Sequence, residues 1–275
     1  MELTEGVSEV LPHAGGQVHV LGFNGNAAIW QKERLINLAR VRLPPSCSKI
    51  VWADADILFE DPQWLSKTSA MLETKMVLQP FSRAVNLSRS GHTDGDVAGC
   101  DEVESFSSVF ARSPEPAQKY TFKSHGHTGY AWAARRELLQ ATGLYDACMT
   151  GSGDHLMAHA FSGTVDSACV STTLGGGAHA RHFHAWAARA GRFVDGRLGA
   201  IEGRVFHLWH GRTEDRRYHE RNQTFKRFAF DPERDLQATE SGLWEWAGSA
   251  AEIKAWSHDL FVSRAEDGPS AHETV

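Results

Sequence analysis

The most informative pattern in the sequence is a short apolar run that ends in two acidic residues. Residues 49–53 read Lys-Ile-Val-Trp-Ala, with the β-branched and aromatic side chains typical of a buried strand. Asp54 and Asp56 follow, separated by one alanine. Because a buried carboxylate is costly unless it is paired or coordinated, we expect both acids to have partners. If the strand continues through them, alternation places both carboxylates on the same face.

The segment before this run predicts a strand–helix–strand unit. Residues 17–23 favour a short strand, and the Asn-Gly-Asn sequence at 24–26 provides a turn and a helix cap. Residues 27–43 carry apolar side chains at helical spacing, and the two prolines that follow end that helix. Such a unit favours a parallel connection. The two acids would then lie at the carboxyl end of a strand, where open α/β sheets bind their ligands.

The rest of the chain predicts more strands and helices. In chain order, they are a helix over 61–71, a strand over 75–80, a long loop over 82–101, a strand over 127–134, a helix over 135–142, a helix after a glycine-rich turn at 151–155, a helix over 182–190, a strand over 205–211 and a last element over 231–246. The predicted fold class is α/β, with three layers in which helices flank a mostly parallel central sheet. We expect one domain over residues 1–264 and a disordered tail over 265–275.

The composition narrows the classes of function. Apolar residues make up 41% of the 275 positions, which is enough to fill a core. The net charge of −6, without a basic run, argues against nucleic acid or an anionic membrane as the main partner. No apolar run approaches the roughly 20 residues of a membrane-spanning helix, and the first residues lack a secretory signal, so we expect a cytoplasmic enzyme. The four cysteines are far apart, which argues against a thiolate zinc site.

The acid pair itself suggests a chemistry. Carboxylate oxygens are the hard donors that Mg²⁺ and Mn²⁺ prefer, and proteins often share these ions with substrate phosphates. Asp54 and Asp56 therefore predict a Mn²⁺ or Mg²⁺ site and a phosphorylated substrate.

Four segments together resemble a known enzyme family. Asp54-Ala55-Asp56 resembles the DxD signature of GT-A-fold glycosyltransferases, especially those of family 2. Residues 129–136, Gly-Tyr-Ala-Trp-Ala-Ala-Arg-Arg, look like the acceptor-side strand that precedes the catalytic acid in many such enzymes. Residues 151–154 resemble the glycine-rich turn with that acid, and residues 207–211, His-Leu-Trp-His-Gly, resemble the late segment that completes the metal site. The resemblance covers residues 17–211.

The resemblance implies the metal ligands. Asp56 matches the acid that binds the metal, and Asp54 matches the acid that reaches metal-bound water or the ribose. His207 or His210 would supply a further ligand. The two histidines face opposite ways on a regular strand, and the glycine after His210 favours that residue. The ion would act as a Lewis acid on the departing diphosphate of a nucleotide-sugar.

The acid of the glycine-rich turn is the candidate general base. Asp154 precedes a predicted helix, whose N-terminus favours the ionised carboxylate. A base must reach the acceptor hydroxyl, and an exposed turn permits this. The alternative is an ordinary helix cap. His155 is the second candidate, because this chain has Asp-His where many relatives have Glu-Asp. One direct displacement would invert the anomeric centre.

Three further residues are candidates for contacts with the nucleotide-sugar. Trp132 offers a stacking face or packs in the core. Lys32 contacts phosphate or lies on a solvated helix face. Arg212, the first of several arginines, clamps the diphosphate or lies on an exposed helix. The expected partners are a UDP- or GDP-sugar donor and a carbohydrate or other hydroxyl acceptor.

One departure from the family concerns the start of the chain. Residues 1–16 are polar, so the opening strand–helix unit that holds the nucleotide base in the family is missing or much reduced. A shortened sheet would expose an edge, which favours pairing of two copies as a homo-oligomer.

Two other functions stay open at this point. One is a metal-dependent hydrolase built from the residues Asp54, Asp56, His155, His159 and His210, since the first two of these histidines are four apart on a helix and can face one ion. The other is a degenerate relative that binds a sugar or nucleotide without catalysis.

Overall fold

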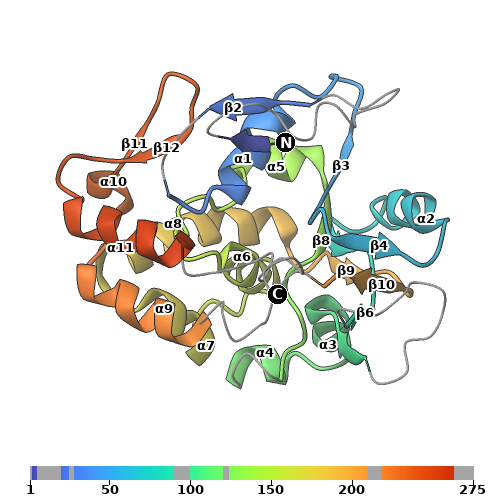
Figure 1. The fold of residues 1–275 in the computed structure, drawn as a ribbon. Coiled ribbons are helices and arrows are strands. Elements are labelled where there is room, and N and C mark those ends of the chain that lie inside the picture. Colours follow the sequence, from blue (N-terminus) through green and yellow to red (C-terminus); the bar gives the residue numbers. More distant parts are fainter. Residues whose placement is uncertain are drawn as a thin grey trace, which may run out of the picture.

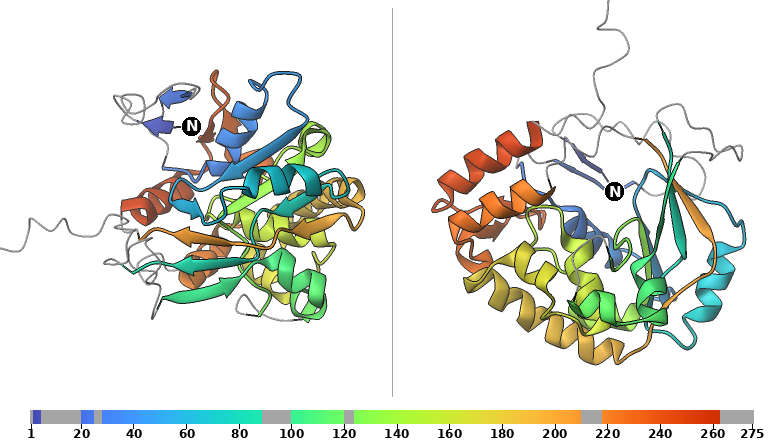
Figure 2. Two further views of the ribbon diagram at one scale, coloured as in Figure 1. Left: turned by 90° about the vertical axis from the view of Figure 1, so that its right-hand side faces the viewer. Right: turned by 90° about the horizontal axis from the view of Figure 1, so that it is seen from below.

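A computed structural model describes residues 2–4, 20–24, 28–88, 100–119, 124–209 and 218–262 of the chain. These residues form a mixed α/β fold in which helices α7 to α11 gather on one side and two four-stranded sheets on the other, with α6 between them (Figure 1). Figure 2 shows the same separation from below. Among the described helices, none combines the length and the apolar character that a bilayer span requires.

The described strands are short. They are β1 (Glu2–Thr4), β2 (Gly22–Asn24), β3 (Lys49–Ala53), β4 (Ile57–Phe59), β5 (Val77–Gln79), β6 (Arg83–Asn86), β7 (Asp101–Glu104), β8 (Ala131–Arg135), β9 (Leu198–Ala200), β10 (Arg204–His207), β11 (Leu236–Ala238) and β12 (Trp244–Trp246).

The described helices range from one turn to five. They are α1 (Lys32–Arg40), α2 (Trp64–Met71), α3 (Phe106–Arg112), α4 (Glu115–Lys119), α5 (Arg136–Thr142), α6 (Gly153–Ser162), α7 (Ala168–Leu174), α8 (Gly177–Val194), α9 (Tyr218–Phe225), the 3₁₀ helix η3 (Lys226–Phe228), α10 (Pro232–Asp235) and α11 (Ala251–Val262).

The first four-stranded sheet has the order β3-β8-β5-β9. Strand β8 runs antiparallel to both β3 and β5, and β5 is parallel to β9. On β3, the side chains of Ile50 and Trp52 are buried while their neighbours are partly or fully exposed. This alternation places one face of the strand on the core, and it confirms the strand predicted over residues 49–53.

The second four-stranded sheet has the order β4-β10-β6-β7. Strand β10 pairs antiparallel with β4 and parallel with β6. In this register His207 lies opposite Ile57, the residue after Asp56. The backbone N–H of Leu208 also donates to the Asp56 carbonyl oxygen at 2.8 Å. The pairing of β4 with β10 therefore brings the second acid of the pair beside a late histidine.

The prediction of a mostly parallel central sheet is wrong. Most of the pairings in the two four-stranded sheets are antiparallel, and β2 pairs with β1 rather than with β3. The prediction failed because the strands on either side of α1 do not share a sheet: β2 pairs with β1, while β3 pairs antiparallel with β8, which comes much later in the chain. The short turn after β3 leads into β4 of the other four-stranded sheet. The acids lie in this turn, so the expectation that they share one face of a strand is also wrong.

Other element predictions had mixed outcomes. Helices α2 and α5 match the predicted helices over 61–71 and 135–142, and α6 begins in the glycine-rich turn as expected. The loop predicted over 82–101 is wrong at its start, which forms β6, and at its end, where β7 begins. The pattern also missed α11. The tail over 265–275 and most of the segment 17–21 lie outside the described residues.

The largest core packs helices against the first sheet. It contains Trp132 of β8, Leu139 of α5, Leu156 of α6 and Phe183 of α8, all of them fully buried. Burial of one such side chain contributes about 1.5–3 kcal/mol to stability. This packing fixes the position of α6, including its first turn, relative to the end of β3.

Candidate functional site

A lysine joins two of the acids that the sequence singled out. The Nζ atom of Lys32, at the start of α1, donates to Asp54 Oδ1 at 3.0 Å and to Asp154 Oδ2 at 2.5 Å. All three side chains are partly buried, and Asp154 is the least exposed at 15%. The segments 54–56 and 151–154, which are distant in the sequence, therefore meet at one cation.

The first turn of α6 presents Asp154 to this cation. Gly153 begins the helix, and a side chain at that position would overlap with the carboxylate of Glu33. Glycine therefore lets α1 and α6 approach closely. The position of Asp154 near a helix N-terminus favours its ionised form.

The buried charges affect one another. Burial lowers the pKa of Lys32, but the carboxylates of Asp154 and Asp54 outweigh this effect and raise that pKa well above its usual range. Burial raises the pKa of Asp154, and Lys32 opposes the increase. Burial also raises the pKa of Glu33 to about 8, so Glu33 is mostly protonated at neutral pH. One partly buried cation thus faces two carboxylates beside a neutral carboxyl group.

The second acid has a different partner. Asp56 Oδ2 lies 3.4 Å from His207 Nε2. The other ring nitrogen of His207, Nδ1, lies 3.1 Å from Asn86 Oδ1, which also accepts from the Tyr130 hydroxyl at 2.6 Å. Because an amide oxygen can only accept, His207 Nδ1 must carry a proton. In the neutral imidazole, Nε2 therefore directs a lone pair toward the Asp56 carboxylate.

Tyr130 connects the two halves of the site. Its backbone carbonyl accepts from the Asp54 N–H at 2.7 Å, while its ring stacks on His127 with centroids 3.9 Å apart. The φ angle of Tyr130 is 76°, in the left-handed region that non-glycine residues rarely adopt. Such a conformation costs about 1–3 kcal/mol and occurs most often at functional sites. Tyr130 therefore positions Asp54 through its backbone carbonyl. Its hydroxyl group also bonds to Asn86, which in turn contacts His207.

Asp56 and His207 are suited to a divalent cation. A carboxylate oxygen and an imidazole lone pair that face each other at 3.4 Å repel unless a proton or cation lies between them. Mg²⁺ and Mn²⁺ commonly take one or two protein ligands and complete their shell with phosphate and water. The residue types of Asp56 and His207 fit that pattern, while Asp54 pairs with Lys32.

Two predicted site residues lie away from this site. Trp132 is 1% exposed, and its Nε1 donates to the Thr128 carbonyl at 2.8 Å, so it cannot offer a stacking face to a ligand. His155 is buried and lies with His125, His159 and Cys169 instead of with the acids. Trp132 therefore packs in the core, which is one of the two alternatives that the sequence left open, and the structure does not bring His155 together with the acids.

His210 and Arg212 lie outside the described residues, so their predicted roles stay predictions. The single hydrolase site combining Asp54 and Asp56 with His155 and His159 does not form among the described residues, since those two histidines belong to a separate cluster.

The sequence pattern missed Asn86. It lies at the end of β6, in a segment that polar composition had marked as loop. The parallel pairing of Asn86 with His207 in the second sheet brings the two side chains together, and only the sheet register reveals this contact.

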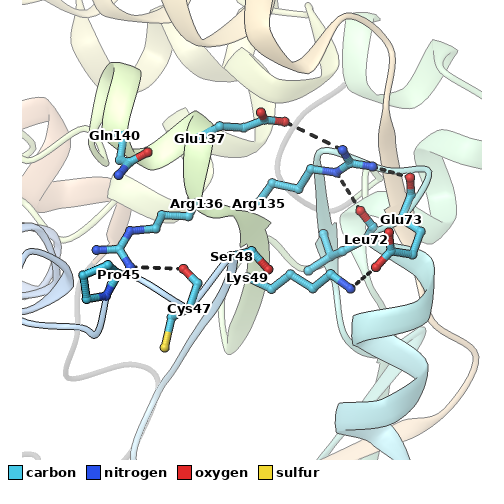
Figure 3. A pocket seen from close by; sticks show the side chains of 10 residues that line it. All are labelled: Pro45, Cys47, Ser48, Lys49, Leu72, Glu73, Arg135, Arg136, Glu137 and Gln140. Carbon is cyan, nitrogen blue, oxygen red and sulfur yellow. Dashed lines mark hydrogen bonds and ion pairs between the residues drawn. The ribbon is translucent and has the colours of Figure 1, made fainter.

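A hollow in the described part of the molecule lies elsewhere. It has a volume of about 390 Å³ and lies around Lys49, at the opposite end of β3 from the acids. Figure 3 shows Arg135 and Arg136 at its wall, with their guanidinium groups bonded to neighbouring groups. Arg135 donates to the carbonyls of Leu72 and Lys75 after α2, and Arg136 donates to that of Cys47. These arginines therefore hold the backbone around the hollow.

Comparison with known protein families, with curated proteins and with solved structures finds no match to this chain.

Proposed function

We propose that the protein is a metal-dependent glycosyltransferase that moves a sugar from a nucleotide-sugar to an acceptor hydroxyl. The observation that carries the proposal is the meeting of three of the four matching segments, 54–56, 151–154 and 207–211, around Lys32 and His207. Asp54 and Asp154 share the Lys32 ammonium group, and Asp56 lies beside His207. The combination of these contacts is more specific than the two-acid motif alone.

In this proposal Asp56 and His207 hold a divalent cation, Mn²⁺ or Mg²⁺. The ion, when bound, offsets the negative charge that develops on the departing diphosphate. Asn86 keeps the Nδ1 proton of His207 in place, which leaves Nε2 for the cation. Such outer partners of a ligating histidine fix its tautomer and its orientation.

Asp154 acts as the general base. It accepts the proton of the acceptor hydroxyl at a carboxylate oxygen while that hydroxyl oxygen attacks the anomeric carbon. Burial raises the pKa of Asp154, which strengthens it as a base, while Lys32 opposes the increase and favours the ionised form. One direct displacement of the diphosphate inverts the anomeric centre. Lys32 also carries positive charge beside Asp54, on the side where the nucleotide would bind.

The experiment that tests the proposal measures donor turnover. The protein is incubated with a panel of UDP- and GDP-sugars and simple sugar acceptors, with and without Mn²⁺, and mass spectrometry follows both products and released nucleoside diphosphate. We expect the protein to consume one donor only when Mn²⁺ is present. Asp56→Ala should lose this activity. The control Asp166→Ala, which changes an exposed acid, should keep it. If the protein neither consumes nor binds any donor with Mn²⁺, the proposal fails.

A further inference from the structure

A second cluster of potential metal ligands lies in the core, apart from the acids. His125 lies in the segment before β8, His155 and His159 lie one turn apart on α6, and Cys169 is in the first turn of α7. One ligand atom from each residue can be chosen so that all four atoms lie within 4.8 Å of one another. All four residues are buried, and three separate segments of the chain converge there.

Hydrogen bonds orient His159 toward the centre of the cluster. His159 Nδ1 lies 2.7 Å from Thr164 Oγ1 and 3.2 Å from the Thr164 carbonyl oxygen. The opposite ring nitrogen, Nε2, lies 3.2 Å from Cys169 Sγ. In metal sites, a ligating histidine almost always donates its other nitrogen to a carbonyl or similar group in this way.

The other two imidazoles are held in a comparable manner. His125 Nδ1 lies 3.0 Å from the Gly126 carbonyl oxygen, which can only accept, so the Nδ1 atom carries the proton and Nε2 carries the lone pair. His155 is hydrogen-bonded to the main chain of Cys169. The ring centroids of the three histidines lie 4.6 to 5.2 Å apart. Three imidazoles and a thiol therefore surround one point.

The surroundings favour neutral imidazoles. Burial and the neighbouring histidines lower the pKa of His155 and of His159, the latter to about 3, and burial lowers that of His125. Phe106 packs edge-on against His125 and His159 and covers the cluster with an apolar ring. No carboxylate belongs to the cluster as the structure describes it. Neutral imidazoles are the form that binds metal.

We propose that His125, His155, His159 and Cys169 bind a structural zinc ion. Three nitrogen ligands and one thiolate are a donor set that zinc takes, and structural zinc sites have four protein ligands in a tetrahedron. With Zn–N bonds of about 2.0 Å and a Zn–S bond of about 2.3 Å, tetrahedral geometry places the four ligand atoms about 3.3–3.5 Å apart. The His159–Cys169 pair is already close to this separation, and the widest pairs need to close by up to about 1.5 Å. As the zinc–sulfur bond forms, the Cys169 thiol releases its proton to solvent.

The site would fasten the elements that carry the candidate catalytic groups. His155 directly follows Asp154 on α6, and the segment after His125 carries His127 and Tyr130. Zinc at the cluster would hold α6, α7 and this segment in a fixed arrangement. Its role is structural because all four positions of the tetrahedron are filled by protein, which leaves none for a substrate.

The test begins with the unmodified chain. We expect protein purified without added metal to contain one zinc ion per chain by elemental analysis, and we expect chelation to lower its melting temperature until Zn²⁺ is restored. Refilling with Co²⁺ should give the visible bands of a tetrahedral ion and a near-ultraviolet thiolate-to-cobalt charge-transfer band. A protein that carries no zinc, takes up no Co²⁺ and is not stabilised by Zn²⁺ would overturn the proposal, and the cluster would then be a hydrogen-bonded part of the core.

Two variants locate the metal. Cys169→Ser should lose the charge-transfer band, whereas Cys148→Ser, which changes another buried cysteine outside the cluster, should keep it. A band that persists in Cys169→Ser contradicts the site. Asp56→Ala should keep its zinc, because the proposed glycosyltransferase cation lies elsewhere. Loss of zinc in Asp56→Ala would place the ion at the acid site and also overturn the inference.

Discussion

The ammonium nitrogen of Lys32 lies 2.5 Å from Asp154 Oδ2, although the two residues are 122 positions apart in the sequence. The same nitrogen contacts Asp54 at 3.0 Å. Removal of the charge in Lys32→Gln leaves two partly buried carboxylates without their shared cation. We expect the free energy of unfolding, measured by chemical denaturation, to fall by about 2 kcal/mol.

Lys67 provides the matched control for this substitution. Lys67 contacts Asp61 at the same distance, 2.5 Å, but its side chain is 49% exposed, compared with 27% for Lys32. Because exposed ion pairs contribute little, Lys67→Gln should change the free energy of unfolding by less than about 1 kcal/mol. Equal effects of the two substitutions would mean that Lys32 does not hold the site together.

A second prediction separates binding from transfer. Asp154→Asn keeps the size of the side chain and removes its basicity, so the transfer rate should fall by about 100- to 10,000-fold. The Mn²⁺-dependent affinity for the nucleotide should stay close to that of the unmodified chain. Kinetic and binding measurements on Asp154→Asn and on Asp166→Asn, an exposed control, check both statements. Normal transfer by Asp154→Asn would exclude Asp154 as the base.

The same assignment predicts the pH dependence of the rate. The base works only when ionised, and burial raises the pKa of Asp154. The transfer rate should therefore fall as the pH is lowered through this raised value, while the protein stays folded. A rate that is constant down to the usual range of an exposed aspartate would contradict a buried carboxylate as base.

A third prediction concerns Glu33 and stability. Burial raises the pKa of Glu33 from 4.5 to about 8. Between these values the unfolded chain has lost the proton and the folded chain has kept it, so the free energy of unfolding decreases as the pH rises. Glu33→Gln, which is neutral throughout, lacks this contribution. The free energy of unfolding of Glu33→Gln, compared with that of the unmodified chain at the same pH, should therefore increase between about pH 5 and about pH 8. The total increase should be on the order of a few kcal/mol.

Denaturation at several pH values tests the role of Glu33. Glu137→Gln is the control, because Glu137 lies at the exposed surface of α5. We expect Glu137→Gln to follow the unmodified chain. If Glu33→Gln also follows the unmodified chain across this pH range, Glu33 is ionised in the folded protein.

A fourth prediction concerns the support of His207. Asn86→Ala removes the oxygen that accepts from His207 Nδ1 and from the Tyr130 hydroxyl. Loss of such an outer partner typically lowers metal affinity about 10- to 100-fold. Mn²⁺ affinity should fall within this range in Asn86→Ala and stay unchanged in Gln140→Ala, an exposed position on α5. An unchanged Mn²⁺ affinity in Asn86→Ala would show that the orientation of His207 does not matter for the metal.

Local sequence signals predicted the parts of the fold that depend on neighbouring residues. The apolar run over residues 49–53 is sufficient to define β3, and the glycine-rich turn before Asp154 marks the start of α6. Strand pairing is not a local property. The direction of β8 relative to β3 depends on which segments meet in space, so the predicted parallel sheet was wrong.

Contacts between distant segments account for what the sequence could not show at the sites. From the sequence, Lys32 could either contact phosphate or lie on a solvated helix face. The sequence did not show its two acidic partners, because they come from other segments. The wide spacing of the cysteines argued against a thiolate zinc site, yet Cys169 meets three histidines that no short motif connects to it. Asn86 reaches His207 only through the pairing of β6 with β10.

The most direct test of the account is calorimetric titration of UDP and GDP into the unmodified chain and into Asp56→Ala, each with and without Mn²⁺. We predict that one nucleotide binds the unmodified chain only when Mn²⁺ is present, and that Asp56→Ala abolishes this binding while Asp166→Ala preserves it. Binding that does not depend on Mn²⁺, or that persists unchanged in Asp56→Ala, would contradict the cation site at Asp56 and His207.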